Sequence, residues 1–201
     1  MNHVFQSTST PVGRLTLVAS ERGLAAILWE NDDPRRVRLG PLREAPAGHP
    51  VLDETARQLG EYFAGERTRF SLPLDFTGTP FQQAVWRELI AIPFGETRSY
   101  GEIAARIGRP KAVRAVGAAN GRNPVSIVAA CHRVIGRNGA LTGFAGGLET
   151  KAALLAHERG VAADRTKDQP RPHLNSTGIA RIATMLTTLI IGFTAGPAVS
   201  L

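Results

Sequence analysis

Cysteine is almost absent from this sequence: Cys131 is the single one among 201 residues. One cysteine cannot form an internal disulfide or supply a cysteine-rich zinc site, so both devices are excluded. Aromatic residues are also scarce, at 6%, while 43% of the chain is hydrophobic and 20% is charged. That balance excludes disordered and fibrous classes and is typical of a globular protein with its own core. An unpaired thiol is typical of a reducing compartment, and we expect a cytoplasmic protein.

Acidic residues are scarce in one region. The chain carries 24 Lys and Arg against 17 Asp and Glu, a formal charge of +7. Residues 1–76 are close to balanced, whereas residues 77–160 hold eleven basic and five acidic side chains. Between Arg98 and Arg137 eight basic residues face one acidic residue, Glu102. A regional excess of this kind favours a face that binds a polyanion such as nucleic acid.

The N-terminal third has the pattern of a small α+β domain. Two apolar runs, 13–20 and 23–30, flank a turn-like Ser-Glu-Arg-Gly, which predicts a β-hairpin. Residues 31–50 are rich in Pro, Arg, Asp and Gly and predict a long loop. Apolar residues at helical spacing predict a helix over 51–64, and a further strand is expected over 70–76. The first five residues lack the basic start and apolar run of a secretory signal, so none is expected.

The next region, 77–162, is expected to be mostly helical. Thr79-Pro80 supplies a cap and a first-turn proline for a helix that should end near Ile92-Pro93. Ser99 and Glu102 form a capping box for a second helix, which should run to Gly108. A third helix is expected over 111–120. The second and third helices, joined by a short turn, predict a helix-turn-helix. A short strand over 126–130 should deliver Cys131, and a last helix is expected over 148–159.

The third helix of this region is unusually rich in small residues. Ala115, Gly117 and Ala118 are among them. Small side chains suit either close packing against a neighbouring helix or entry into a groove of DNA. The surrounding basic excess favours DNA, although helix-turn-helix geometry also occurs in proteins that bind none.

The tetrapeptide Cys131-His132-Arg133-Val134 is the strongest local feature. A thiolate is a far better nucleophile than a thiol, and neighbouring His and Arg side chains can lower the pKa of a cysteine. The alternative is a buried, inert cysteine.

The wider pattern around this tetrapeptide resembles the O6-alkylguanine-DNA alkyltransferases. The order and spacing of several stretches match that family across about 80 residues; they are Phe81–Trp86, Ile92–Ala104, Arg114–Gly117, Asn123-Pro124, Cys131–Gly136 and Leu141–Gly147. The resemblance implies an α+β protein with a ribonuclease-H-like domain over 1–76. It further implies a winged-helix-like, helix-turn-helix domain over 77–162 that carries the active cysteine. Residues 163–201 have no counterpart in the family pattern.

The resemblance also implies a chemistry without cofactor or metal. Cys131 would accept an alkyl group from O6 of a damaged guanine, once per molecule. His132, through a water, and Glu158 would hold and deprotonate the thiol. Tyr100 would donate a proton or hydrogen bond to the leaving guanine. Asn123 would tie the helix-turn-helix to the active-site segment.

The implied partner is double-stranded DNA, from which the target base must be extruded. Arg114 would fill the space that the base leaves. Contacts to DNA are expected from the residues around the helix-turn-helix and the active site: Ser99, Tyr100, Arg114, Ala115, Gly117, Arg122 and Arg133. One-for-one repair needs no oligomer, so a monomer is expected.

Two departures from the family pattern stand next to the site. Ala130 replaces the usual proline before the cysteine, which frees φ and restores an N–H. Phe144 replaces a frequent tyrosine. Some relatives hold zinc in the first domain, and this chain has no cysteine there to support it. A non-catalytic alkylated-DNA sensor, a DNA-binding regulator and, more weakly, a metal-free cysteine hydrolase remain the alternative functions.

The C-terminal residues have a separate pattern. A polar linker is expected over 163–178 and a helix over 176–194, with one apolar stripe at helical spacing: Ile182, Met185, Leu186, Leu189, Ile190 and Phe193. Docking on the body or on a partner, a disordered extension, and contact with a membrane are the three interpretations. Residues 182–201 carry no charge, but their threonines, glycines and proline make a poor membrane helix.

Overall fold

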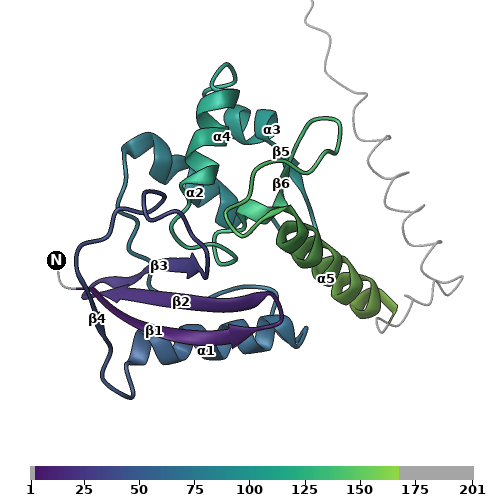
Figure 1. Cartoon of the computed structure of the whole chain (residues 1–201). Coiled ribbons are helices and arrows are strands. Elements are labelled where there is room, and N and C mark those ends of the chain that lie inside the picture. The colour runs from purple at the N-terminus through teal and green to yellow at the C-terminus, as the bar shows by residue number, and fades with distance from the viewer. Residues whose placement is uncertain (1–2, 168–201) are drawn as a thin grey trace, which may run out of the picture. The chain divides into compact units, whose positions relative to one another are not determined.

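A computed structural model of the chain describes residues 3–167. The N-terminal half is a four-stranded sheet in the order β3-β2-β1-β4, covered on one face by helix α1 (Figure 1). Its elements are β1 (His3–Thr10), β2 (Gly13–Ser20), β3 (Gly23–Trp29), β4 (Leu42–Glu44) and α1 (Pro50–Phe63). The expected hairpin over 13–30 is present as the antiparallel pair β2–β3. The expected helix over 51–64 is α1, which begins one residue earlier.

Two expectations for this half are wrong. The loop predicted over 31–50 contains β4, whose three residues pair in parallel with the start of β1. The strand predicted over 70–76 is reduced to one bridge, between Leu74 and Leu24. Pro73 has no N–H, so this segment accepts a hydrogen bond from Leu24 through the Pro73 carbonyl but cannot continue a ladder.

The C-terminal half is mostly helical, and the helices begin where the sequence places their caps. Its elements are α2 (Pro80–Ala91), β5 (Arg98–Ser99), α3 (Tyr100–Arg106), α4 (Val113–Gly121), a 3₁₀ turn (Cys131–Arg133), β6 (Val134–Ile135) and α5 (Leu148–Lys167). Thr79 caps α2, and Ser99 caps α3 through the predicted capping box with Glu102. Helices α3 and α4 form the expected helix-turn-helix, although α4 begins two residues later than predicted.

The strand expected over 126–130 is also wrong. Here the chain turns back on itself: the Ala129 N–H donates to the Val125 carbonyl, and Ile127 has φ of +73°. That left-handed conformation is uncommon for a β-branched residue. The side chain of Asn123 imposes the turn by accepting from the Val125 N–H at 3.1 Å and donating to the Ala129 carbonyl at 2.7 Å.

The two halves share one hydrophobic core, whose buried members are drawn from both halves and range from Leu15 to Leu154. The end of β3 joins them directly, because the Ile27 N–H donates to the Pro124 carbonyl at 2.8 Å and Ile27 forms a bridge with Val125. The first half therefore reaches the segment that leads to Cys131, which fixes the cysteine relative to both halves.

Helix α5 extends beyond its expected end at Arg159. It continues to Lys167, so the first residues of the expected linker, 163–167, are helical. The helix predicted over 176–194 lies outside the described residues. Within residues 3–167, no helix is long and apolar enough to cross a membrane.

Candidate active site

Cys131 opens a short 3₁₀ turn, and its side chain lies beneath the surface. The residue is 3% exposed. Its N–H donates to the Ala129 carbonyl at 2.7 Å, the same carbonyl that accepts from Asn123. Ala130 has φ of −75°, within the range that proline imposes, so the replacement of proline leaves the backbone in a proline-like conformation. Asn123, which follows α4, thus bonds the segment that leads to Cys131.

Burial dominates the electrostatics of the thiol. It raises the pKa of Cys131, whereas hydrogen bonds from Asn123 and Ser126 and the positive charges of Arg36 and Lys151 act to lower it. The sequence-based expectation assigned that lowering to His132 and Arg133, and it is wrong. Neither neighbour in sequence supplies the charge, because both side chains are directed to Glu158. The resting thiol is therefore protonated, and it needs a base to become a nucleophile.

Glu158 of α5 is the centre of a buried polar cluster. Its carboxylate accepts from His132 Nε2 at 2.7 Å and from the Arg133 guanidinium at 2.8 and 2.9 Å. It also accepts from the Tyr62 hydroxyl at 2.8 Å and from the Gly95 N–H at 3.0 Å. Burial alone would raise the pKa of Glu158, but the hydrogen bonds from His132 and Arg133 outweigh it and hold the pKa well below its ordinary value. The carboxylate is therefore charged at neutral pH.

His132 is completely buried in the cluster. Burial lowers its pKa, although the Glu158 carboxylate opposes this shift, so the imidazole is neutral at pH 7. Since Nε2 donates to Glu158, the neutral ring carries its lone pair on Nδ1. Nδ1 has no hydrogen-bond partner among the described residues. A neutral imidazole with an anion behind it is the arrangement of a general base.

Arg133 does not lie on the DNA-binding face, and the expectation that it contacts DNA is wrong. It is 5% exposed, paired with Glu158, and it also donates to the Ile92 carbonyl at 2.5 Å. A buried guanidinium requires such a partner, because an unpaired charge is strongly unfavourable in the interior.

A cleft of about 1060 Å³ opens between the two halves of the described chain. One wall comes from the loop of residues 31–39 and includes Arg36. The opposite wall contains Tyr100, residues of α4 and the loop of residues 143–145. The Tyr100 hydroxyl accepts a hydrogen bond from Thr142 at 3.1 Å. Arg36 lines this cleft and donates to the Asn123 carbonyl, and Asn123 in turn donates to the Ala129 carbonyl that accepts from the Cys131 N–H, so a chain of hydrogen bonds connects the cleft wall to the backbone of the cysteine.

Helix α4 uses its small residues on two different faces. Val116 and Ala119 are buried, and the Ala119 carbonyl accepts from the indole N–H of Trp86 at 2.9 Å. Arg114 and Ala115 are exposed on the other face. Gly117 lines the cleft beside Tyr100, and a Cβ there would lie 3.8 Å from the tyrosine ring. One face of α4 therefore packs against the core, as the first interpretation of the small residues expects. The other face is exposed and leaves the second interpretation, entry into a groove of DNA, open.

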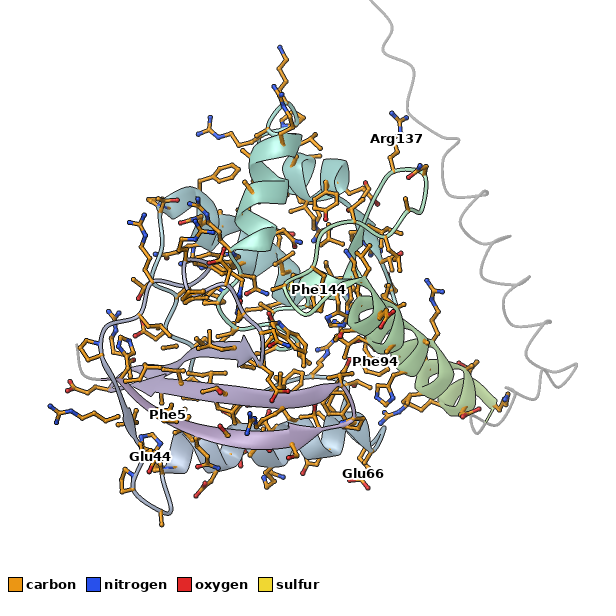
Figure 2. All side chains as sticks on the ribbon, viewed as in Figure 1. Phe5, Glu44, Glu66, Phe94, Arg137 and Phe144 are labelled. Carbon is orange, nitrogen blue, oxygen red and sulfur yellow. The ribbon has the colours of Figure 1, made fainter. Side chains whose placement is uncertain are left out.

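The basic excess of the helix-turn-helix is smaller on the surface than in the sequence. Arg133 is buried, Arg98 pairs with Glu96, and Arg106 pairs with Glu88. These carboxylates lie outside the counted interval: Glu96 is two residues before Arg98, whereas Glu88 and Glu158 reach their partners only through folding. The remaining basic residues are exposed and have no acidic partner within residues 3–167; they are Arg109, Lys111, Arg114, Arg122 and Arg137. Arg137 lies at the tip of the loop that follows β6 (Figure 2). Arg122 also lines the cleft, whereas the Ser99 hydroxyl is occupied in capping α3.

Three residues of the site were missed by sequence reasoning. Tyr62 of α1 bonds Glu158 from 96 positions away. Lys151 is fully buried and donates to the Val134 carbonyl at 2.6 Å and the Thr142 carbonyl at 2.8 Å. Arg36 bonds the carbonyls of Asn123 and Ile27. A lysine within an apolar helical stripe was the one available signal; the other two lie in ordinary contexts. Within the described residues, no group of three or more His, Cys, Asp or Glu could hold a metal ion.

The two tyrosines of the chain allow a matched test of the buried cluster. Tyr62→Phe removes one hydrogen bond to the charged Glu158 and keeps the ring packing, so we expect a loss of about 1.5–3 kcal/mol in unfolding free energy. Tyr100→Phe removes an exposed hydroxyl, so its loss should stay within about 0.5 kcal/mol. Urea denaturation measures both, and equal losses would contradict the assignment.

Comparison with known proteins locates the chain among characterised families. The family model described as "6-O-methylguanine DNA methyltransferase, ribonuclease-like domain" matches residues 4–76, and the corresponding "DNA binding domain" matches residues 80–160. Two relatives carry the name methylated-DNA–protein-cysteine methyltransferase. The Bacillus subtilis protein, called constitutive, is 49% identical over 79% of this chain and 96% of its own length. The Mycolicibacterium paratuberculosis protein is 48% identical over 77% and 92%. The crystal structure of Mycobacterium tuberculosis OGT in complex with DNA superposes with a TM-score of 0.71 at 43% identity, covering 80% of this chain and 94% of that one.

Proposed function

Because this chain belongs to the 6-O-methylguanine DNA methyltransferase family and its activity is alkyl transfer from damaged DNA to a protein cysteine, we propose that Cys131 is the acceptor. The observation that carries this proposal is that Cys131, His132 and Glu158 are all buried and that His132 is bonded to Glu158 through Nε2, which leaves Nδ1 without a partner among the described residues. The base and its orienting carboxylate are thus in contact, and the proposed nucleophile directly precedes the base in the chain, as covalent catalysis by such a trio requires.

The first step is activation of the thiol. The lone pair on His132 Nδ1 takes the proton of Cys131, directly or through a water, and the imidazolium that forms is stabilised by Glu158 at 2.7 Å. Hydrogen bonds from Asn123 and Ser126 and the charges of Arg36 and Lys151 stabilise the thiolate. These groups stabilise the thiolate and so offset the unfavourable burial of its charge once His132 has taken the proton. Until then the cysteine is a protonated thiol, which is a poor nucleophile.

The second step is displacement at the alkyl carbon. The sulfur electron pair forms the S–C bond while the C–O bond to guanine breaks, and its electrons move onto the base. The Tyr100 hydroxyl donates a proton or hydrogen bond to the departing guanine. His132 releases the proton taken from the thiol to solvent, and the group that protonated the guanine regains a proton from solvent, so both side chains return to their neutral forms. The products are guanine and a thioether on Cys131. No group in the site is built to break the thioether, so each molecule reacts once.

Burial of the thiol requires the base to leave the duplex. Cys131 is 3% exposed, so O6 of a stacked guanine cannot approach it. The exposed Arg114 at the start of α4 is suited to fill the gap in the stack. Exposed Arg109, Lys111 and Arg122 supply phosphate contacts that position the duplex without reading its sequence. Ala115 and Gly117 leave room for the DNA backbone beside Tyr100.

The test is a mass measurement on the full chain. Incubation with a duplex that carries one O6-methylguanine should add the mass of one methyl group to the protein, and proteolytic mapping should place it on Cys131. With excess duplex, product should stop at one methyl per protein molecule. The same duplex with unmodified guanine is the control. No mass gain from a duplex that the protein still binds would refute the proposal.

We further propose that the protein acts as a monomer in the cytoplasm. One thiol repairs one lesion, so the chemistry needs no second copy. A reactive free cysteine survives longest in a reducing compartment.

A further inference from the structure

Trp29, the last residue of β3, brings the first half of the chain to the reactive site. It is 7% exposed and lies two residues after Ile27, whose backbone bonds the segment that leads to Cys131. The family pattern in the second half does not include it. Its indole ring makes two kinds of contact near the site, one with Ser126 and one with the loop that carries Phe144.

The first contact involves the thiol. The indole N–H of Trp29 donates to Ser126 Oγ at 3.3 Å. A hydroxyl oxygen that accepts this bond leaves its own hydrogen to be donated elsewhere. Ser126 is one of the groups that act to lower the pKa of the Cys131 thiol. Trp29 therefore holds the hydroxyl of a residue that acts on the thiol.

The second contact involves the loop of residues 143–147, which borders the cleft. Trp29 packs edge-to-face on Phe144, with ring centroids 5.4 Å apart. Phe144 lines the cleft and also approaches the His132 ring edge-on at 6.5 Å (labelled in Figure 2). Gly146 lies so close that a Cβ there would stand 2.8 Å from the indole. The indole thus supports the loop from behind, and the loop has no room to retreat.

We propose that Trp29 is a positioning residue that fixes the Phe144 wall of the cleft and thereby limits the size of the alkyl group that reaches Cys131. The proposal rests on the proposed function, since it concerns the same transfer. A wall held by a rigid indole cannot yield to a bulky group, whereas a smaller side chain at position 29 leaves Phe144 space to move.

The measurement is the ratio of the second-order rate constants for O6-benzylguanine and O6-methylguanine in the same duplex. Trp29→Phe should raise this benzyl-to-methyl ratio by at least about 5-fold, because pocket volume discriminates groups of this size by factors of ten or more. The matched control is Trp86→Phe. Trp86 is the other tryptophan, similarly buried and also hydrogen-bonded through its indole N–H, but its ring packs against Phe76 and not against Phe144. Its loss should leave the ratio unchanged.

A double variant tests whether Trp29 acts through Phe144. Phe144→Leu should raise the ratio by itself, and Trp29→Phe added to it should raise it no further, since the wall is already lost. Multiplying effects would overturn the proposal. So would a folded Trp29→Phe protein that slows methyl and benzyl transfer equally. If that variant does not fold, an unchanged ratio in Phe144→Leu overturns it instead. None of these outcomes affects methylation of Cys131 in the unaltered chain. The mass measurement tests the proposed function, and the benzyl-to-methyl ratio tests the role of Trp29 independently.

Discussion

A Cys131→Ser variant is expected to transfer no detectable methyl group, a loss of at least ~10⁴-fold in rate, as removal of an enzyme's nucleophile typically causes. Serine fits nearly the same volume, and the polar side chains of Asn123 and Ser126 that act on the thiol also suit a hydroxyl, so the fold should survive. The hydroxyl does not ionise under these conditions, and the thiolate that the site stabilises cannot form. The measurement is methyl transfer from labelled duplex under single-turnover conditions.

The control for this variant is DNA binding. The basic face around Arg109, Lys111, Arg114 and Arg122 is unaltered by the change, so affinity for methylated duplex should stay close to that of the unaltered chain. The variant also separates the enzyme from a sensor or a DNA-binding regulator. If cells that carry only the Cys131→Ser protein keep their resistance to alkylation, binding is the function and the enzymatic proposal is wrong.

A Glu158→Gln variant is expected to lose about 3–5 kcal/mol of unfolding free energy, because it leaves the Arg133 charge buried without its counter-ion. Both side chains are almost inaccessible to solvent, so water cannot replace the carboxylate. Thermal unfolding should show a midpoint lower by on the order of 10 °C. Transfer should slow as well, because the imidazolium of His132 loses its stabilising anion. A midpoint close to that of the unaltered chain would show that the cluster contributes little.

The loss should depend on pH in a defined direction. The pKa of Glu158 is lowered in the folded state from its ordinary value of 4.5. A carboxyl of this kind adds stability above its unfolded pKa, and that stability disappears as the pH falls through the folded pKa. The difference between the unaltered chain and Glu158→Gln should therefore be constant above about pH 5.5 and shrink in more acidic solution.

The matched control for Glu158→Gln also removes the Arg133 charge, which that variant leaves without a counter-ion. Adding Arg133→Met to the variant replaces the unpaired guanidinium with an apolar side chain of similar length, so part of the lost stability should return. If the second change instead adds its own full loss, Arg133 is not destabilised by the missing carboxylate.

The sequence alone determined the features that depend on local order. Caps and proline set the start of α2 and α3, because these signals act within three or four residues. The hairpin of β2 and β3 follows from alternation and a short turn for the same reason. The stretches around Cys131 resemble the alkyltransferase family, and that resemblance implied Asn123, His132, Tyr100 and Glu158 as candidate site residues.

Only the tertiary structure decided which charges meet. Arg133 follows His132 directly in the chain, yet it is buried against Glu158 and faces no DNA. Tyr62 and Arg36 belong to the site although nothing near them in the sequence signals it. The expected strand over 126–130 is a turn because the Asn123 side chain competes for its backbone hydrogen bonds. Local patterns cannot reveal such partners, because burial makes each charged or polar group depend on whatever the fold places within hydrogen-bond distance.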